Sequence, residues 1–291
     1  MITEALSHFT GIGPVRLAQL HAAGLRSWMD ICDQPLKIPE SLRSSLLMEA
    51  EQSLTALRRD DLQFFVNEFS PQDRWRILAA YFERTSFFDI ETSGLEIDAA
   101  VTVIVCWHQG QLHTFVEHEN LDEFLDLLDD VTLLASFNGA SFDVPRVLDA
   151  FHIPQLPCPH LDLRWTCYHA GLNGSLKSIA RTLHIDRPAD IVDTDGEVAV
   201  QLWSAWHTRQ DAAARQHLVR YCSADVVMLI LLGQHLADVQ NYEASELWSQ
   251  LPESIGEPCP AASVSSRSLV ANLFGQASPS KLRTRRPRAT G

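Results

Sequence analysis

The chain has 291 residues and a formal net charge of −14 at pH 7, a length that suits one large domain with a smaller companion. The negative charge argues against a broad cationic surface for duplex DNA, because such surfaces neutralise phosphates with lysine and arginine. No apolar run approaches the roughly 20 residues of a membrane span, and the first residues lack a secretory signal, so we expect a cytoplasmic protein with no membrane partner. The six cysteines are scattered, which is typical of reduced, mostly buried thiols and not of a disulfide framework or a zinc site.

Short helices joined by glycine turns are predicted for residues 1–34. Gly11 and Gly13 permit a tight turn, and Pro14 suits the first position of a helix. The free N–H groups at such a helix start are able to bind a phosphate. This stretch resembles the helix-hairpin-helix motif, which implies that Gly11, Ile12 and Gly13 contact a nucleic-acid backbone. The alternative is a compact interaction bundle without DNA contact.

The segment from Ser86 to Leu95 is predicted to begin with a strand. Side chains alternate between the faces of a strand, so Asp89 and Glu91 point to the same side while Ile90 points into the core. Two carboxylates held this close repel each other, and such a pair is typical of a site for Mg²⁺ or Mn²⁺. The alternative is an edge strand that carries two solvated acids.

Further strands and helices follow in an order that indicates the fold. Strands are predicted over 101–107, 112–116 and 133–137, with a helix over 121–128 before the last of them. Strand, strand, strand, helix, strand is the opening order of a ribonuclease-H-like sheet. The rest of this region is helix-rich, with segments near 144–151, 175–184, 196–208 and 211–237.

Two more acidic residues stand where a site would need them. Asp143 follows the fourth strand and a short turn that begins at Asn138, which places it at the C-terminal edge of the sheet; it would otherwise only cap the next helix. Asp225 lies in a mostly apolar helix and shares a face with Tyr221, four residues earlier. A buried acid needs a partner, and no basic residue stands at the right helical spacing downstream to supply a salt bridge.

Together, residues 89–91, 138–143 and 221–225 resemble the three exonuclease motifs of the DEDD superfamily. Tyr221 places the chain in the tyrosine subclass, because the histidine subclass would carry its histidine at the position of Arg220. Residues 160–163 and 175–180 extend the resemblance to the YprB-like, ribonuclease-H-like nucleases, many of which also carry an N-terminal helix-hairpin-helix. Within these two segments, Asp162 and Lys177 have packing and capping as alternatives to a functional role.

The resemblance implies an α/β fold in which a ribonuclease-H-like mixed sheet is flanked by helices and preceded by a small all-α helix-hairpin-helix domain. The expected domains are a helix-hairpin-helix-like domain over 1–60, a helical linker over 61–84, the nuclease over 85–245 and a tail, disordered and basic at its end, over 246–291. Residues 281–291 contain basic and no acidic residues, so we expect the tail to attract nucleic acid.

The resemblance also implies the site. Two divalent ions, Mg²⁺ or Mn²⁺, would be held by carboxylates, one of which bridges both ions. Tyr221 would position the attacking water, and Thr92, Asn138 and Phe142 would contact the substrate. The four expected metal ligands are Asp89, Glu91, Asp143 and Asp225.

The implied function is metal-dependent 3′–5′ exonuclease activity, with single-stranded DNA as the favoured substrate and a free 3′ end as its starting point. The alternatives are a catalytically silent nucleic-acid-binding adaptor and a ribonuclease-H-type endonuclease. A basic or DNA-repair protein is the kind of partner that the acidic charge would suit. Four tryptophans have two interpretations, base stacking or a position in the core, and the core is favoured. They are Trp107, Trp165, Trp203 and Trp206.

Overall fold

The computed structural model describes residues 1–33, 40–94, 96 and 98–254. Two predictions for the C-terminal part, which concern Cys259 and the basic run 281–291, lie outside the described residues. All described residues belong to one unit of the chain.

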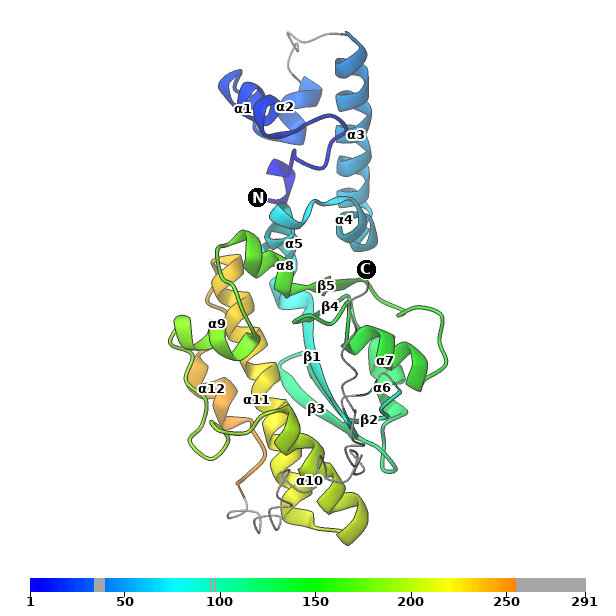
Figure 1. The fold of residues 1–291 in the computed structure, drawn as a ribbon. Coiled ribbons are helices and arrows are strands. Elements are labelled where there is room, and N and C mark those ends of the chain that lie inside the picture. Colours follow the sequence, from blue (N-terminus) through cyan, green and yellow to red (C-terminus); the bar gives the residue numbers. More distant parts are fainter. Residues whose placement is uncertain (34–39, 95, 97, 255–291) are drawn as a thin grey trace, which may run out of the picture. The chain divides into compact units, whose positions relative to one another are not determined.

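A five-stranded mixed sheet forms the centre of this unit (Figure 1). The strand order is β3-β2-β1-β4-β5, in which β1 and β2, and β2 and β3, run antiparallel, while β1 and β4, and β4 and β5, run parallel. The predicted mixed sheet flanked by helices is therefore confirmed. The strands are β1 (Thr85–Thr92), β2 (Val101–His108), β3 (Gln111–Val116), β4 (Leu133–Ser136) and β5 (His160–Asp162).

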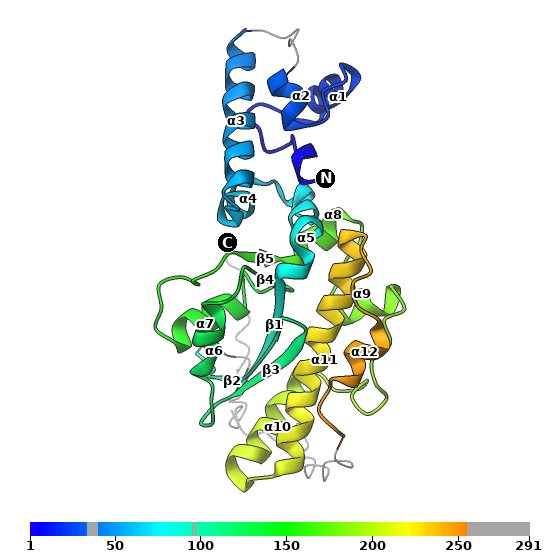
Figure 2. The same cartoon turned by 180° about the vertical axis from the view of Figure 1, so that it is seen from behind.

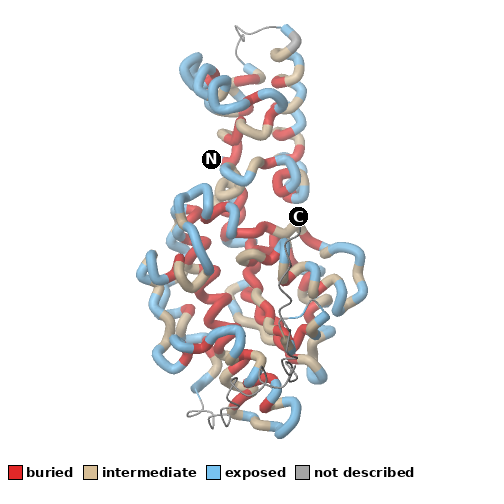
Figure 3. Tube along the Cα trace, in the orientation of Figure 1, coloured by how far each residue is buried: buried red, intermediate tan, exposed pale blue. Residues whose placement is uncertain are grey.

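Helices cover both faces of the sheet, as the two opposite views show (Figures 1 and 2). The long helix α11 (Ala212–Ala237) crosses one face and packs on β1 and β2. On the other face, α6 (Glu123–Leu128) and α7 (Asp143–Ala150) contribute to a second apolar cluster with Phe88 and Ile90. Because β1 is covered on both sides, most of its side chains are buried (Figure 3).

The helices that follow the sheet agree with the four predicted helical segments, and they add two that the sequence did not indicate, α8 and α12. Helix α11 is buried along most of its length because it packs on the sheet and on the neighbouring helices α5, α9, α10 and α12. The remaining helices of this part are α8 (Leu163–His169), α9 (Leu176–Thr182), α10 (Gly196–Arg209) and α12 (Ala244–Ser249).

The N-terminal part of the chain is helical, as predicted. Helix α1 begins at Pro14, and Gly11 adopts a positive φ of 77°, which a glycine accepts without strain. The ring of Trp28 stacks on Phe65 with centroids 5.9 Å apart, so the first part of the predicted linker packs against the N-terminal helices. The elements are η1 (Ile2–Glu4), α1 (Pro14–Ala22), α2 (Trp28–Asp33), α3 (Glu40–Arg58), α4 (Leu62–Glu68), η2 (Pro71–Asp73), α5 (Trp75–Tyr81) and η3 (Phe82–Arg84).

The expected domain boundaries stay a prediction. Helix α12 runs through residue 246, where the tail is expected to begin. Among the helices that the structure describes, none combines the length and the apolar character that a membrane crossing requires.

Candidate active site

Strand β1 presents two carboxylates on one face of the sheet. Asp89 and Glu91 are half-buried and share the face that α11 covers, whereas Ile90 is buried in the apolar cluster on the opposite face. The predicted alternation along this strand is therefore confirmed. It follows from the period of two in an extended chain, which sends neighbouring side chains to opposite faces.

Helix α11 brings a second group of side chains to the same place. Tyr221 and Asp225 are both buried, one turn apart on this helix. Between them, Cys222 directs its thiol toward Asp89, with Sγ 3.7 Å from Oδ2 and 3.5 Å from the carbonyl oxygen of that residue. Ligand atoms of Asp89, Glu91 and Cys222 all lie within 4.8 Å of one another. The sequence analysis missed Cys222, although its position three residues before Asp225 would have placed both on one helix face.

The turn between β4 and α7 supplies the next acid. Asp143 is buried and is the first residue of α7, whereas the capping position belongs to Phe142. Asn138 adopts a positive φ of 64°, and the backbone at Gly139 passes so close that an added Cβ would lie 3.2 Å from Asp143 Oδ2 and 1.8 Å from Ser136 Oγ. The interpretation of Asp143 as a mere helix cap is therefore wrong, and the tight turn fixes where this carboxylate lies.

Burial and mutual repulsion set the electrostatics of these acids. Burial, followed by the negative charges of Asp143, Asp225 and Glu91, raises the pKa of Asp89 well above its ordinary value. The pKa of Glu91 is raised well above its ordinary value in the same way, by burial and then by Asp225. Burial is also the main cause that raises the pKa of Asp143 to about 7. A divalent cation would stabilise the ionised form of these carboxylates. Their oxygen atoms therefore fit a hard metal ion.

Asp89, Glu91, Asp143 and Asp225 are together called the acidic group. Two positively charged side chains reach it from the segment between β5 and α10. Arg187 donates from Nη2 to Asp225 Oδ1 at 3.0 Å, and the two side chains are only 6% and 11% exposed. Lys177 donates from Nζ to the Tyr221 hydroxyl at 2.6 Å and to the Thr194 carbonyl oxygen at 3.1 Å. Asp225 therefore has a basic partner that comes from outside its own helix. The partner lies 38 residues earlier in the chain, where helical spacing gives no signal.

Burial raises the pKa of Asp225 even though Arg187 and then Lys177 act to lower it. Burial, followed by the charge of Asp225, also raises the pKa of Tyr221 far above its ordinary value, so the phenol keeps its proton. A protonated phenol that accepts a hydrogen bond from Lys177 still has its own O–H to donate.

Asp162 supports the turn and is not part of the acidic group. Its carboxylate accepts hydrogen bonds from the backbone N–H groups of Asn138 at 2.8 Å and Ala140 at 3.1 Å. It also caps α8 by accepting from the Arg164 N–H at 2.9 Å. Of the two interpretations left open for Asp162, capping is the one that the structure confirms.

The other residues predicted to bind nucleic acid are spread over different parts of the chain. Thr92 is buried at the end of β1 and donates to the Gly94 carbonyl oxygen. Phe142 is half-buried, and the Arg146 guanidinium carbon lies 4.1 Å from the centroid of its ring. The loop of Gly11, Ile12 and Gly13 belongs to the N-terminal helices and is not part of the acidic group. Asn138, the last of the set, lines a neighbouring pocket.

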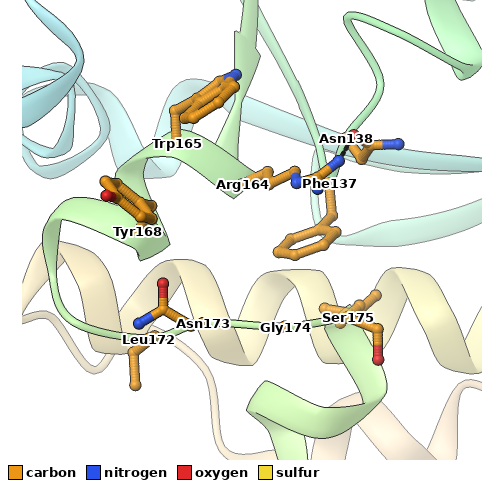
Figure 4. Close-up of a pocket in the computed structure, with 10 residues that line it drawn as sticks. Phe137, Asn138, Arg164, Trp165, Tyr168, Leu172, Asn173, Gly174 and Ser175 are labelled. Carbon is orange, nitrogen blue, oxygen red and sulfur yellow. Dashed lines mark hydrogen bonds between the residues drawn. The ribbon is translucent and has the colours of Figure 1, made fainter.

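That pocket has a volume of about 650 Å³ and lies between the turn after β4, helix α8 and the start of α9 (Figure 4). Its walls include Phe137, Arg164, Trp165 and Tyr168. Trp165 is 50% exposed, so the favoured interpretation of this tryptophan as a core residue is wrong.

The chain is similar to one protein family and to solved structures. None of the curated proteins matches the chain. Among solved structures, the chain is similar to the family B DNA polymerase from the hyperthermophilic archaeon Pyrobaculum calidifontis, with 18% sequence identity and a TM-score of 0.42. The match covers 56% of this chain but only 28% of the polymerase chain. A sequence model of the RNase_H superfamily matches residues 86–237, which is more than half of the chain and contains all four acids. The chain therefore belongs to the RNase_H superfamily.

Proposed function

We propose that the protein is a metal-dependent 3′–5′ exonuclease that hydrolyses phosphodiester bonds at the 3′ end of nucleic acid, with single-stranded DNA as the favoured substrate. Membership of the RNase_H superfamily supports a nuclease. The observation that carries the proposal is the convergence of acids from β1, α7 and α11, whose pKa values are raised mainly by burial and, at Asp89 and Glu91, also by the charges of the neighbouring acids.

In this proposal, Asp89, Glu91, Asp143 and Asp225 would hold two divalent ions. Mg²⁺ or Mn²⁺ suits them because these ions prefer oxygen ligands. The Cys222 thiol does not change this preference, because burial and then the charge of Asp89 raise its pKa well above the ordinary value and keep it protonated. When bound, the ions would lower the pKa of a water molecule and stabilise the departing 3′ oxygen.

Tyr221 and Lys177 would act on the attacking water and on the phosphate. The Tyr221 hydroxyl accepts from Lys177 Nζ, and its own O–H is hydrogen-bonded to the Asp225 carboxylate. When Asp225 binds a metal ion, that O–H would turn to the attacking water and orient it. Lys177 would at the same time hold a positive charge beside the phosphate as negative charge develops there. The role of Tyr221 supports the tyrosine subclass. The histidine subclass would use the residue at position 220 instead, and here Arg220 binds Asp190, with Nε 2.6 Å from Oδ2.

The N-terminal helices would act as a YprB-like helix-hairpin-helix module that grips the nucleic-acid backbone. Helix α1 begins at Pro14 after Gly13 and has no side-chain cap, so the N–H groups of its first turn would be available to a phosphate. Ile12 is buried and anchors the loop, while Gly11 and Gly13 are exposed. We propose that residues 1–60 form this module, that 61–84 are a helical linker, that 85–245 form the nuclease and that 246–291 are a tail. We also propose a basic or DNA-repair protein as the partner.

A nuclease assay tests the proposed function. Single strands of DNA and RNA, labelled at the 3′ or the 5′ end, would be incubated with Mg²⁺, Mn²⁺ or EDTA beside the variants Asp89→Ala and Asp225→Ala. We expect a metal-dependent ladder that shortens from the 3′ end and is absent in both variants. Internal cuts would favour the ribonuclease-H-type endonuclease instead, and intact binding without any cleavage would favour the silent adaptor.

A further inference from the structure

The pocket beside the acidic group has features that the proposed chemistry does not use. Trp165 and Tyr168 project from α8 with 50% and 58% of their surfaces exposed. Their ring centroids are 6.1 Å apart and the ring planes meet at 75°, so the two rings present different faces to the solvent. Large aromatic side chains usually bury most of their surface, and two exposed neighbours on the rim of one pocket mark a binding surface.

Two segments of the chain connect the pocket with the acidic group. On one side, Phe137 and Asn138 line it, and the same turn leads to Asp143 at the start of α7. On the other side, Leu176 lines it, and the next residue is Lys177, which contacts Tyr221. A chain molecule whose end lies among the four acids therefore has this pocket as a neighbouring place for its next units.

Arg164 is the single cation among the residues that line the pocket. Its guanidinium donates to Asn138 Oδ1, and its side chain reaches toward Asn138 along the pocket wall (Figure 4). Arg164 is exposed and its partner is a neutral amide, so a phosphate oxygen would be a stronger acceptor for the same donor.

We propose that this pocket binds the unpaired bases that lie just 5′ of the bond to be cleaved, with Trp165 and Tyr168 as stacking platforms and Arg164 as the contact to a backbone phosphate. The inference rests on the proposed nuclease function and deepens it, because it makes an unpaired strand the substrate. Bases in a duplex are stacked on each other and would have to be pulled apart before they met these rings. Stacking also suits an acidic chain with a net charge of −14, because it adds affinity that does not depend on a broad cationic surface.

Two substrates separate this inference from the proposed function. The methyl ester of thymidine 5′-monophosphate has only a methyl group 5′ of the bond to be cleaved and needs only the acidic group, whereas an oligothymidylate strand also needs the pocket. For Trp165→Ala/Tyr168→Ala we expect the KM for the strand to rise about tenfold or more, in line with the loss of base–aromatic stacking, while hydrolysis of the ester is unchanged. Trp165→Phe/Tyr168→Phe keeps both rings and is expected to keep the native KM. Met48→Ala, which removes another exposed apolar side chain, 53% exposed on α3, is the matched control.

Abasic substrates locate the stacked bases. Strands with one abasic position at successive distances from the 3′ end would be bound in Ca²⁺ and followed by fluorescence anisotropy. We expect the native protein to lose affinity for abasic positions close to the 3′ end, and Trp165→Ala/Tyr168→Ala to show no such loss. An unchanged strand KM in this variant, or an identical abasic profile in both proteins, would overturn the pocket assignment. If the native protein hydrolysed neither the ester nor the strand, the proposed function would fail and the pocket assignment with it.

Discussion

At the scale of single residues, Arg187 occupies an unusual position. It forms a buried ion pair with Asp225, and it also donates to the Thr194 carbonyl oxygen at 3.4 Å. Asp225 is proposed here as a metal ligand, so the guanidinium and the metal ion compete for the same carboxylate. In the metal-free protein the arginine neutralises part of the acidic group, and a bound ion takes over that part of its role.

Replacing Arg187 with methionine separates its effect on stability from its competition with the metal ion. Breaking a buried ion pair leaves an uncompensated charge, so we expect the free energy of unfolding of the metal-free protein to fall, by up to about 3 kcal/mol. Mn²⁺ should nevertheless bind more tightly, because no guanidinium has to be displaced from Asp225. Chemical denaturation and calorimetric titration with Mn²⁺ would measure the two quantities.

Arg215→Met is the control for this experiment, since Arg215 pairs with Glu119 at the surface, where ion pairs contribute little. We expect neither stability nor Mn²⁺ affinity to change much in this variant. Weaker Mn²⁺ binding in Arg187→Met than in the native protein would contradict the competition between arginine and metal.

At the scale of elements, the position of α11 on the sheet depends on Gly233. A Cβ added there would lie 2.9 Å from Phe87 Cε1 and 3.2 Å from Phe82 Cε2. Phe87 belongs to β1, two residues before Asp89, and Gly233 lies about two turns of α11 beyond Asp225. The missing side chain therefore lets the helix approach the strand closely enough for their acids to meet.

Gly233→Ala is expected to lower the free energy of unfolding by about 1–3 kcal/mol, because an added methyl group overpacks the interface. This loss of stability should exceed the gain that comes from the higher helix propensity of alanine. Adding Phe87→Leu should recover part of the loss, which a double-mutant cycle by urea denaturation would measure. Gly196→Ala, at the start of α10 where nothing lies within 4 Å of the added Cβ, should be close to neutral. Equal effects of the two alanine substitutions would show that close approach at Gly233 does not matter.

At the scale of the whole molecule, the acidic group links stability to pH and to metal. Carboxyl groups of an unfolded chain titrate near pH 4, whereas the pKa of Asp143 in the folded protein is about 7 and those of Asp89 and Glu91 are well above their ordinary values. Through this window the folded protein holds protons that the unfolded chain has released. The stabilisation is complete below the unfolded pKa and is lost as the pH rises through the folded values.

We therefore expect the metal-free protein to lose stability as the pH is raised from about 4.5 to about 7.5 on account of these acids. Mn²⁺ at millimolar concentration should then raise Tm at the upper pH by on the order of 5 °C, because it binds only the folded acidic group. Asp89→Asn should give a higher metal-free Tm than the native protein at that pH and a smaller shift with Mn²⁺. Thermal scans at both pH values would test this, and the absence of any Mn²⁺ shift would count strongly against the metal site.

The sequence was most informative where a local period applies. The alternation of Asp89 and Glu91 and the positions of the strands follow from periodic patterns, and the structure agrees with them. Arg187 escaped such reasoning because it reaches the site from an irregular segment, far from its partner in the chain. Lys177 was named with its role left open, because its contact with Tyr221 joins two distant parts of the chain and gives no periodic signal. The exposure of Trp165 was missed for a related reason, because α8 is a short helix that the sequence did not indicate.

Strand β1 carries the acids on one face and the apolar side chains Phe88 and Ile90 on the other. A one-residue insertion or deletion that shifts the register of this strand would exchange these two sets. Both carboxylates would then lie in the apolar core and two bulky apolar side chains in the site. A point substitution on one face leaves the other face intact, whereas a change of length damages folding and chemistry together. This strand is therefore more sensitive to a change in its number of residues than to a substitution on one of its faces.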